Sequence, residues 1–170
     1  MRTADWSVML VTPSRFEGRL LLDVLRSAGV ARTQLAADSE AAFGQLARDP
    51  ANIVLIAHDA TPIDALRWVR QLRRSKTCRA RSAPVLVLTR SLTASVAEAC
   101  RIAGANAVIG LPASGATLLT TIRKVLATPR PFVEDATYVG PCRRAGIVTA
   151  GAGSHRRRTD GPAPTSAARS

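Results

Sequence analysis

Short apolar runs alternate with amphipathic segments through residue 127, and this alternation constrains the fold more than any other feature. Five apolar runs have the length and composition of strands: 6–12, 33–37, 53–57, 84–89 and 106–109. Each is followed by a segment with helical spacing of its apolar residues: 15–28, 40–48, 63–74, 93–103 and 114–127. Strand–helix alternation repeated five times predicts an α/β protein with a flavodoxin-like, doubly wound, five-stranded parallel sheet.

The charge of the chain predicts an acidic partner. The net charge is +12, and Lys76 and Lys124 are the only lysines among 24 basic residues. Such an excess of arginine favours binding of a nucleotide, a nucleic acid, an acidic protein or a membrane surface. No apolar run approaches about 20 residues, the length of a membrane span, so no membrane insertion is expected.

The cysteines argue against a metal centre and against a disulfide framework. Cys78, Cys100 and Cys142 are odd in number and widely spaced, and no two of them form a CxxC pair. This usage is typical of a reducing compartment, and the residues before the first apolar run do not resemble a secretion signal. We therefore expect a cytoplasmic protein without a cofactor or a bound metal.

The sequence changes character after residue 128, which predicts a folded domain over 1–128 and a separate tail over 129–170. Residues 130–170 hold seven arginines against three carboxylates, a net charge of +4. The end of the chain, 159–170, is rich in Pro, Ala, Ser and Gly, and 145–153 reads as a spacer of small residues. The tail is thus predicted to be largely disordered and to carry the ligand-binding residues.

Over residues 7–127 the chain resembles the CheY-like receiver domains of bacterial two-component systems. The landmarks that carry the resemblance are Asp64-Ala65-Leu66 after the third strand, Thr89 at the end of the fourth, Ala103-Gly104-Ala105 before the fifth, and Pro112 after it. The resemblance implies a signalling domain rather than an enzyme, with its chemistry at the carboxyl ends of the strands.

The phosphorylation chemistry of that family does not carry over to this sequence. Thr12 and Pro13 stand where receivers have magnesium-binding acids, Ala57 stands at the phosphoacceptor position, and Leu111 replaces the lysine before the proline. Without a carboxylate nucleophile and a metal, phosphoryl transfer has no route. Thr89 is then expected to be a buried hydroxyl bonded to the backbone. Asp59, two residues past the strand, is expected to be a turn residue.

The tail has a second resemblance, to CheY-like cyclic di-GMP effectors of alphaproteobacteria, in which an arginine-rich C-terminal segment wraps the dinucleotide. The first half of the motif is Tyr138, Gly140, Pro141, Arg143 and Arg144; the second is Ser154, His155, Arg156, Arg157 and Arg158. The resemblance implies docking on a protein such as the flagellar motor switch. Arginine can take guanine O6 and N7 bidentately, and an arginine or Tyr138 can stack on the base.

Other interpretations of the basic residues stay open. The chain fits an adaptor that acts by protein contact alone, with the tail as a nonspecific anionic anchor. A second basic patch, Arg67, Arg70, Arg73 and Arg74, followed by Lys76, Arg79 and Arg81, is most simply a solvated helix face. No pattern of a nucleic-acid-binding motif is present, so specific recognition of nucleic acid is not expected. Nonspecific binding of nucleic acid is a third interpretation, which predicts a steep salt dependence without nucleotide preference.

Overall fold

The computed structural model describes residues 2–59 and 63–151. The strands of its main sheet are β1 (Ser7–Val11), β2 (Arg32–Ala36), β3 (Ile53–Ala57), β4 (Val85–Thr89), β5 (Ala107–Gly110) and β8 (Val148–Gly151). The helices are α1 (Arg15–Ser27), α2 (Ser39–Arg48), α3 (Ala65–Arg74), α4 (Ala94–Ala103) and α5 (Gly115–Ala127). The remaining elements are β6 (Phe132–Glu134), β7 (Val139–Pro141) and three 3₁₀ turns, η1 (Thr3–Asp5), η2 (Arg79–Ser82) and η3 (Arg143–Ala145).

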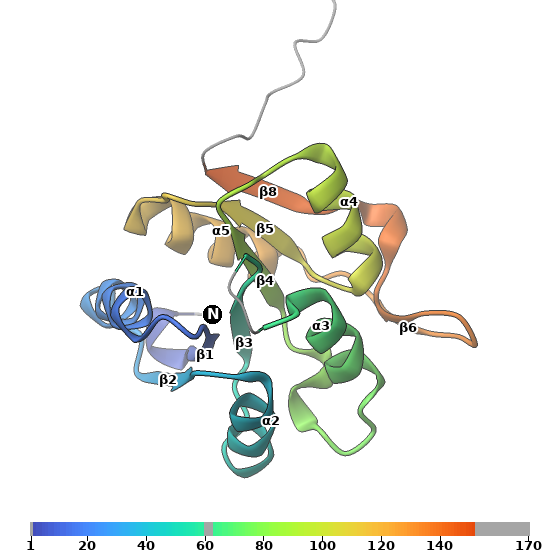
Figure 1. Ribbon diagram of the computed structural model, residues 1–170, viewed down its shortest axis with the longest axis horizontal. Helices are drawn as coiled ribbons and strands as arrows, with labels where there is room; N and C mark the ends of the chain where they lie inside the picture. Colours follow the sequence, from blue (N-terminus) through green and yellow to red (C-terminus); the bar gives the residue numbers. More distant parts are fainter. Residues whose placement is uncertain (1, 60–62, 152–170) are drawn as a thin grey trace, which may run out of the picture.

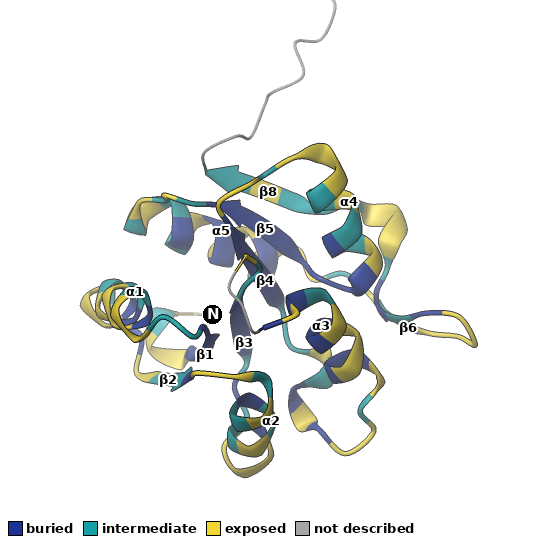
Figure 2. Cartoon of the chain, in the orientation of Figure 1, coloured by how far each residue is buried: buried dark blue, intermediate teal, exposed yellow. Residues whose placement is uncertain are grey.

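The main sheet is wholly parallel, with the order β2-β1-β3-β4-β5-β8 and helices on both faces (Figure 1). Alternate residues of each strand point to opposite faces, so the sheet supports two aliphatic cores. Met9 and Val11 pack with α2, α3 and α4, whereas Val8 and Leu10 pack with α1 and α5. The central strands are buried on both sides, as Figure 2 shows, which confirms the predicted flavodoxin-like α/β class.

Side-chain caps define where the helices begin. Ser14, Asp38, Asp64, Thr93 and Ser114 each accept a hydrogen bond from the backbone N–H three residues on. Such a cap satisfies one of the free N–H groups in the first turn of a helix. Within the described residues no helix is both long and apolar enough to cross a membrane.

Within residues 2–59 and 63–151 the sheet has six strands rather than the five predicted, because the start of the predicted tail is folded. After α5 the chain forms the antiparallel hairpin β6–β7 and the turn η3, and then adds β8 to the edge of β5. Ile147 packs against the core beside α2, α3 and α4, and Val148 packs against the core beside α1 and α5, so together they anchor this strand. The prediction of a flexible spacer over 145–153 is therefore wrong for 148–151. The rest of the predicted tail, 152–170, lies outside the described residues.

Glycine permits the close approach of β8 to β5. Gly151 pairs with Gly110 at the end of the ladder and has a φ of +87°. A Cβ at Gly151 would overlap the carbonyl oxygen of Gly110. A side chain at this position would therefore be strained twice, by its backbone conformation and by its neighbour.

Candidate functional site

The positions of the degenerate phosphorylation site meet at the carboxyl end of the sheet, as predicted. Thr12 follows β1, Ala57 ends β3, Thr89 ends β4 and Leu111 follows β5, while Pro13 is half-buried beside Thr12. Among the described residues, no cluster of three or more His, Cys, Asp or Glu side chains could hold a metal ion.

Asp59 reaches back into this end of the sheet. The Thr89 hydroxyl donates to Asp59 Oδ2 at 2.7 Å, and the backbone N–H of Arg90 donates to the same oxygen at 2.5 Å. The Thr89 hydroxyl also accepts from the backbone N–H of Ser91 at 3.1 Å, as expected of a buried threonine bonded to backbone, whereas the expectation of a plain turn aspartate at 59 is wrong in this respect. Burial tends to raise the pKa of Asp59, but the hydrogen bonds from Thr89 and Arg90 outweigh it and hold the pKa below its usual value. The threonine hydroxyl therefore already has an ionised oxygen partner.

The first half of the predicted ligand motif forms an ordered hairpin against α3 and α4. Tyr138 is 7% exposed, and its hydroxyl donates to the carbonyl of Pro141 at 2.7 Å. Gly140, with a φ of +153°, lies so close to the Tyr138 ring that a Cβ would meet its hydroxyl. Burial raises the pKa of Tyr138, although neighbouring arginines oppose the shift, so the phenol remains a donor at neutral pH. Tyr138, Gly140 and Pro141 thus build a buried platform, and only a small part of Tyr138 remains open to a ligand.

Arg143 lies on this platform. Its guanidinium is 4.2 Å from the centroid of the Tyr138 ring, a cation–π contact, and its side chain stays exposed. The backbone carbonyl of Arg143 accepts from Arg101 Nη1 at 2.9 Å, and Arg101 is paired with Glu98. Arg144 follows in η3 and is also exposed. The turn therefore presents two arginines from a fixed backbone.

The structure brings Arg143 together with the basic patch of α3, a pairing that the sequence did not reveal. A pocket of about 110 Å³ lies between these elements, lined by Arg70, Arg74, Ile102, Ala103, Thr137, Tyr138, Val139 and Arg143. Residues that had been treated as two separate basic segments thus share one surface. The second predicted half of the motif, Ser154, His155 and Arg156 to Arg158, lies outside the described residues.

Arg73 does not belong to the exposed patch in which the sequence placed it. Its side chain is fully buried and donates to the carbonyls of Gly104 (3.0 Å), Arg81 (2.6 Å) and Ala83 (2.7 Å) and to Asn106 Oδ1 (3.0 Å). Burial lowers the pKa of Arg73 to about 9, so the group is still charged at neutral pH. Arg73 therefore ties α3 to η2 and to the turn between α4 and β5.

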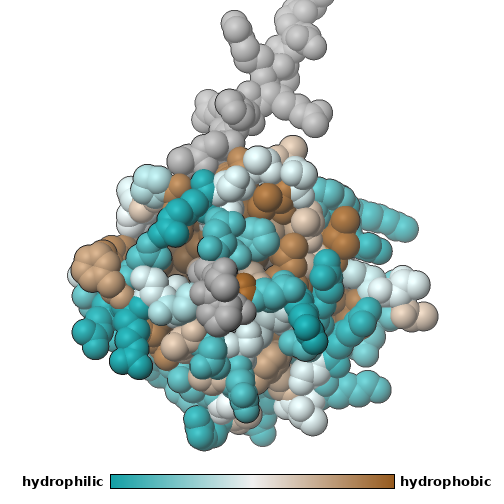
Figure 3. Space-filling model, viewed as in Figure 1, coloured by the Kyte–Doolittle hydropathy of each residue, from teal (hydrophilic) through white to brown (hydrophobic). Residues whose placement is uncertain are grey.

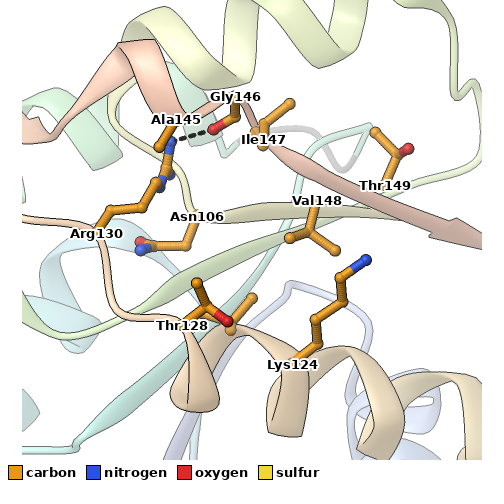
Figure 4. Close-up of a pocket in the computed structure, with 10 residues that line it drawn as sticks. Asn106, Lys124, Thr128, Arg130, Ala145, Gly146, Ile147, Val148 and Thr149 are labelled. Atoms are coloured by element: carbon orange, nitrogen blue, oxygen red, sulfur yellow. Dashed lines mark hydrogen bonds between the residues drawn. The ribbon is translucent and has the colours of Figure 1, made fainter.

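A second pocket, of about 420 Å³, lies between the end of α5 and β8, and Figure 4 shows its lining residues. Arg130 reaches across it and donates to the carbonyl of Gly146 at 2.5 Å and to the carbonyl of Ala105. These bonds fix the segment that leads into β8. The guanidinium of Arg130 is thus occupied by bonds to the backbone, whereas Lys124 contributes a positive charge to the same pocket.

Comparison with known proteins places this geometry among receiver folds. No family model matches the chain, but it is 26% identical over 131 residues to the sensory/regulatory protein RpfC from two strains of Xanthomonas campestris. That match covers 77% of this chain and 18% of the length of the relative.

Three solved structures are similar at 15–20% sequence identity. The chemotaxis response regulator CheY4 of Vibrio cholerae has a TM-score of 0.64 and 20% identity, over 71% of this chain and 98% of that one. The signal receiver domain of a DNA-binding response regulator from Colwellia psychrerythraea has a TM-score of 0.65 and 17% identity, over 73% of this chain and 100% of that one. A CheY-like receiver domain protein from Methanospirillum hungatei has a TM-score of 0.63 and 15% identity, over 72% of this chain and 94% of that one. The chain has the receiver fold. Relative to that fold, β8 is an addition that follows the last helix, α5.

Proposed function

We propose that this receiver-fold chain is a phosphorylation-independent signalling effector. It binds cyclic di-GMP through its arginine-rich C-terminal segment and docks on a protein target such as the flagellar motor. The observation that carries the proposal is the presentation of Arg143 on the Tyr138 ring, next to Arg70 and Arg74. Within the described residues, none of these three side chains has a recorded ion pair with a carboxylate. An anionic ligand would supply the missing partner.

The chemistry of the ligand fits these arginines. Cyclic di-GMP offers two phosphates, and each guanine presents O6 and N7, which one arginine can take through two parallel hydrogen bonds. The pocket of about 110 Å³ beside Arg143 admits one such group rather than a whole dinucleotide. The proposal therefore assigns the rest of the ligand to Arg144 and to residues 154–158, which lie beyond the described part.

Calorimetric titration with cyclic di-GMP at physiological salt tests the proposal, with GTP and GMP as controls. We expect Arg143→Ala and Arg156→Ala each to weaken binding by roughly 5- to 150-fold, the equivalent of about 1–3 kcal/mol for a lost bidentate contact. Arg19→Ala removes an equally exposed arginine from α1 and should leave the affinity unchanged. The tail should be removed after Gly151, because a deletion from residue 137 would also remove β8 from the sheet.

Two results would contradict the proposal. One is the absence of binding to the intact chain; the other is equal affinity for cyclic di-GMP, GTP and GMP, which would indicate general anion attraction. Loss of binding in the Arg19→Ala control would show that total charge, rather than this site, determines affinity.

The proposal also predicts that the chain does not form an aspartyl phosphate. Ala57 lacks a carboxylate, and the Asp59 oxygen that faces Thr89 is already hydrogen-bonded. After incubation with acetyl phosphate and Mg²⁺, the intact mass should be unchanged, and Asp59→Asn should behave like the parent chain. A phosphorylated species that disappears in Asp59→Asn would overturn the phosphorylation-independent part of the proposal.

A second candidate function is an adaptor that works by protein contact alone. Phe16 and Leu20 are 73% and 52% exposed, and Leu20 lines a groove of about 390 Å³ with Leu21, Val24, Pro112 and Ala113. Exposed apolar residues beside a groove favour a protein partner. Capture of purified motor switch proteins separates the candidates: the adaptor binds equally with and without cyclic di-GMP, whereas the effector requires it.

A further inference from the structure

The exposed face of α3 carries a row of arginines that packing does not explain. Arg67, Arg70 and Arg74 lie at helical spacings of three and four residues, which places them one above another. The opposite face packs into the core through Ala65, Trp68, Val69 and Leu72. Like charges at this spacing destabilise a helix, and among the described residues no ion pair to any of the three is recorded.

This row continues into the site at Tyr138. A pocket of about 420 Å³ is lined by Arg67, Arg70, Gln71, Arg74 and Ser75. Its residues Arg70 and Arg74 also line the pocket of about 110 Å³ that contains Arg143. α3 packs against β7, and Figure 3 shows hydrophilic side chains gathered over α3. The two pockets therefore adjoin at Arg70 and Arg74, and the surface that they make up together, with Arg67 at one end and Arg143 at the other, is called the groove below.

The carboxylates near this groove are already engaged. Glu98 is bound by Arg101 at 2.5 Å, and that hydrogen bond lowers the pKa of Glu98. Asp135 accepts from the backbone N–H and hydroxyl of Thr137 and from the N–H of Tyr138, and these hydrogen bonds lower its pKa. Both acids also attract Arg143 electrostatically, but among the described residues neither forms an ion pair with Arg143 or with the three arginines of α3.

We infer that Arg67, Arg70 and Arg74, together with Arg143, form a phosphate-binding groove that takes a phosphodiester of the nucleotide ligand. The inference rests on the proposed function and deepens it, since it assigns the phosphates to α3 and leaves the guanines to the C-terminal arginines. Planar guanidinium groups bind phosphate oxygens through paired hydrogen bonds. The α3 backbone is held by buried Arg73, so the positions from which three of the four arginines extend are fixed before binding.

The test compares Arg70→Ala/Arg74→Ala with the matched pair Arg19→Ala/Arg123→Ala, which removes two exposed arginines from α1 and α5. Each double variant is titrated with cyclic di-GMP and, as a probe that has phosphate groups but no nucleobase, with inorganic pyrophosphate. We expect the α3 double variant to bind cyclic di-GMP at least about tenfold more weakly than the parent chain and not to bind pyrophosphate. The matched double variant should bind both probes as the parent does. Arg70→Lys/Arg74→Lys, which keeps the charge, should recover part of the pyrophosphate binding.

The outcomes separate this inference from the proposed function. If the α3 pair binds cyclic di-GMP like the parent while Arg143→Ala does not, the groove inference is wrong and the effector proposal stands. If the parent binds pyrophosphate through α3 but not cyclic di-GMP, the groove stands and the proposed ligand is wrong. If both double variants lose binding equally, net charge explains the affinity and the groove inference is overturned.

Discussion

Replacing Arg73 with alanine should lower the free energy of unfolding by about 3–5 kcal/mol, among the largest effects of any single change in this chain. The substitution leaves a cavity and removes the donors of four hydrogen bonds, to Gly104, Arg81, Ala83 and Asn106. Buried carbonyls without a partner are costly because they have lost water as well as protein donors. Urea unfolding at pH 7, followed by circular dichroism, measures the change.

The neighbouring residue supplies the control for this prediction. Arg74→Ala removes the same side chain from the exposed face of the same helix and should change stability by no more than about 0.5 kcal/mol. Arg73→Lys keeps the charge but has too few donors, in a different geometry, to serve the same four acceptors. A loss below about 1 kcal/mol in Arg73→Ala would mean that the network does not join α3 to η2 and the α4–β5 turn.

A methyl group at Gly151 should release β8 from the sheet. The backbone there has a φ of +87°, which costs an alanine about 1–2 kcal/mol, and the Cβ would also overlap the carbonyl oxygen of Gly110. Together these should lower the free energy of opening by about 2 kcal/mol or more, so that the amides of β8 exchange about 30-fold faster. Hydrogen exchange followed by mass spectrometry of the C-terminal peptides measures the effect.

Gly146 offers a matched control for Gly151. Its φ is +73°, but a Cβ there would meet nothing within 4 Å. Gly146→Ala should therefore show only the backbone cost, about 1–3 kcal/mol for a non-glycine residue at this φ with a ψ of −169°, without the collision. Equal exchange rates in the two variants would argue that β8 is not held in close contact with β5.

The core of the fold could be predicted from the sequence because its signals are local. Each central strand is a continuous apolar run, and the helix starts carry side-chain caps such as Asp38 and Ser114. β8 lacked such a signal, since Val148 to Gly151 contains one strongly β-forming aliphatic residue and ends in glycine. Its stability comes from pairing with β5, a contact that no local pattern encodes.

The site was less predictable because its contacts join distant segments. The bond between Asp59 and Thr89, and the meeting of Arg143 with α3, depend on how the chain is packed. Arg73 is different, because a signal was present: it continues the helical spacing of the buried residues Trp68, Val69 and Leu72. A charged residue in line with an apolar stripe indicates a buried, hydrogen-bonded side chain. This signal is lost when Arg73 is only counted among the basic residues of the segment.

The burial of Arg73 also has a consequence for how fast an anion arrives. The attraction of the exposed arginines for a distant anion is screened by salt, and so is that of a buried charge, because the anion approaches through solvent. Arg73 lies on the same helix as Arg70 and Arg74 and keeps its charge at neutral pH, since burial lowers its pKa to about 9. Arg73 therefore adds to the positive potential that draws a phosphate toward α3 at low ionic strength. The association rate should consequently fall with salt more steeply than the number of exposed arginines would suggest.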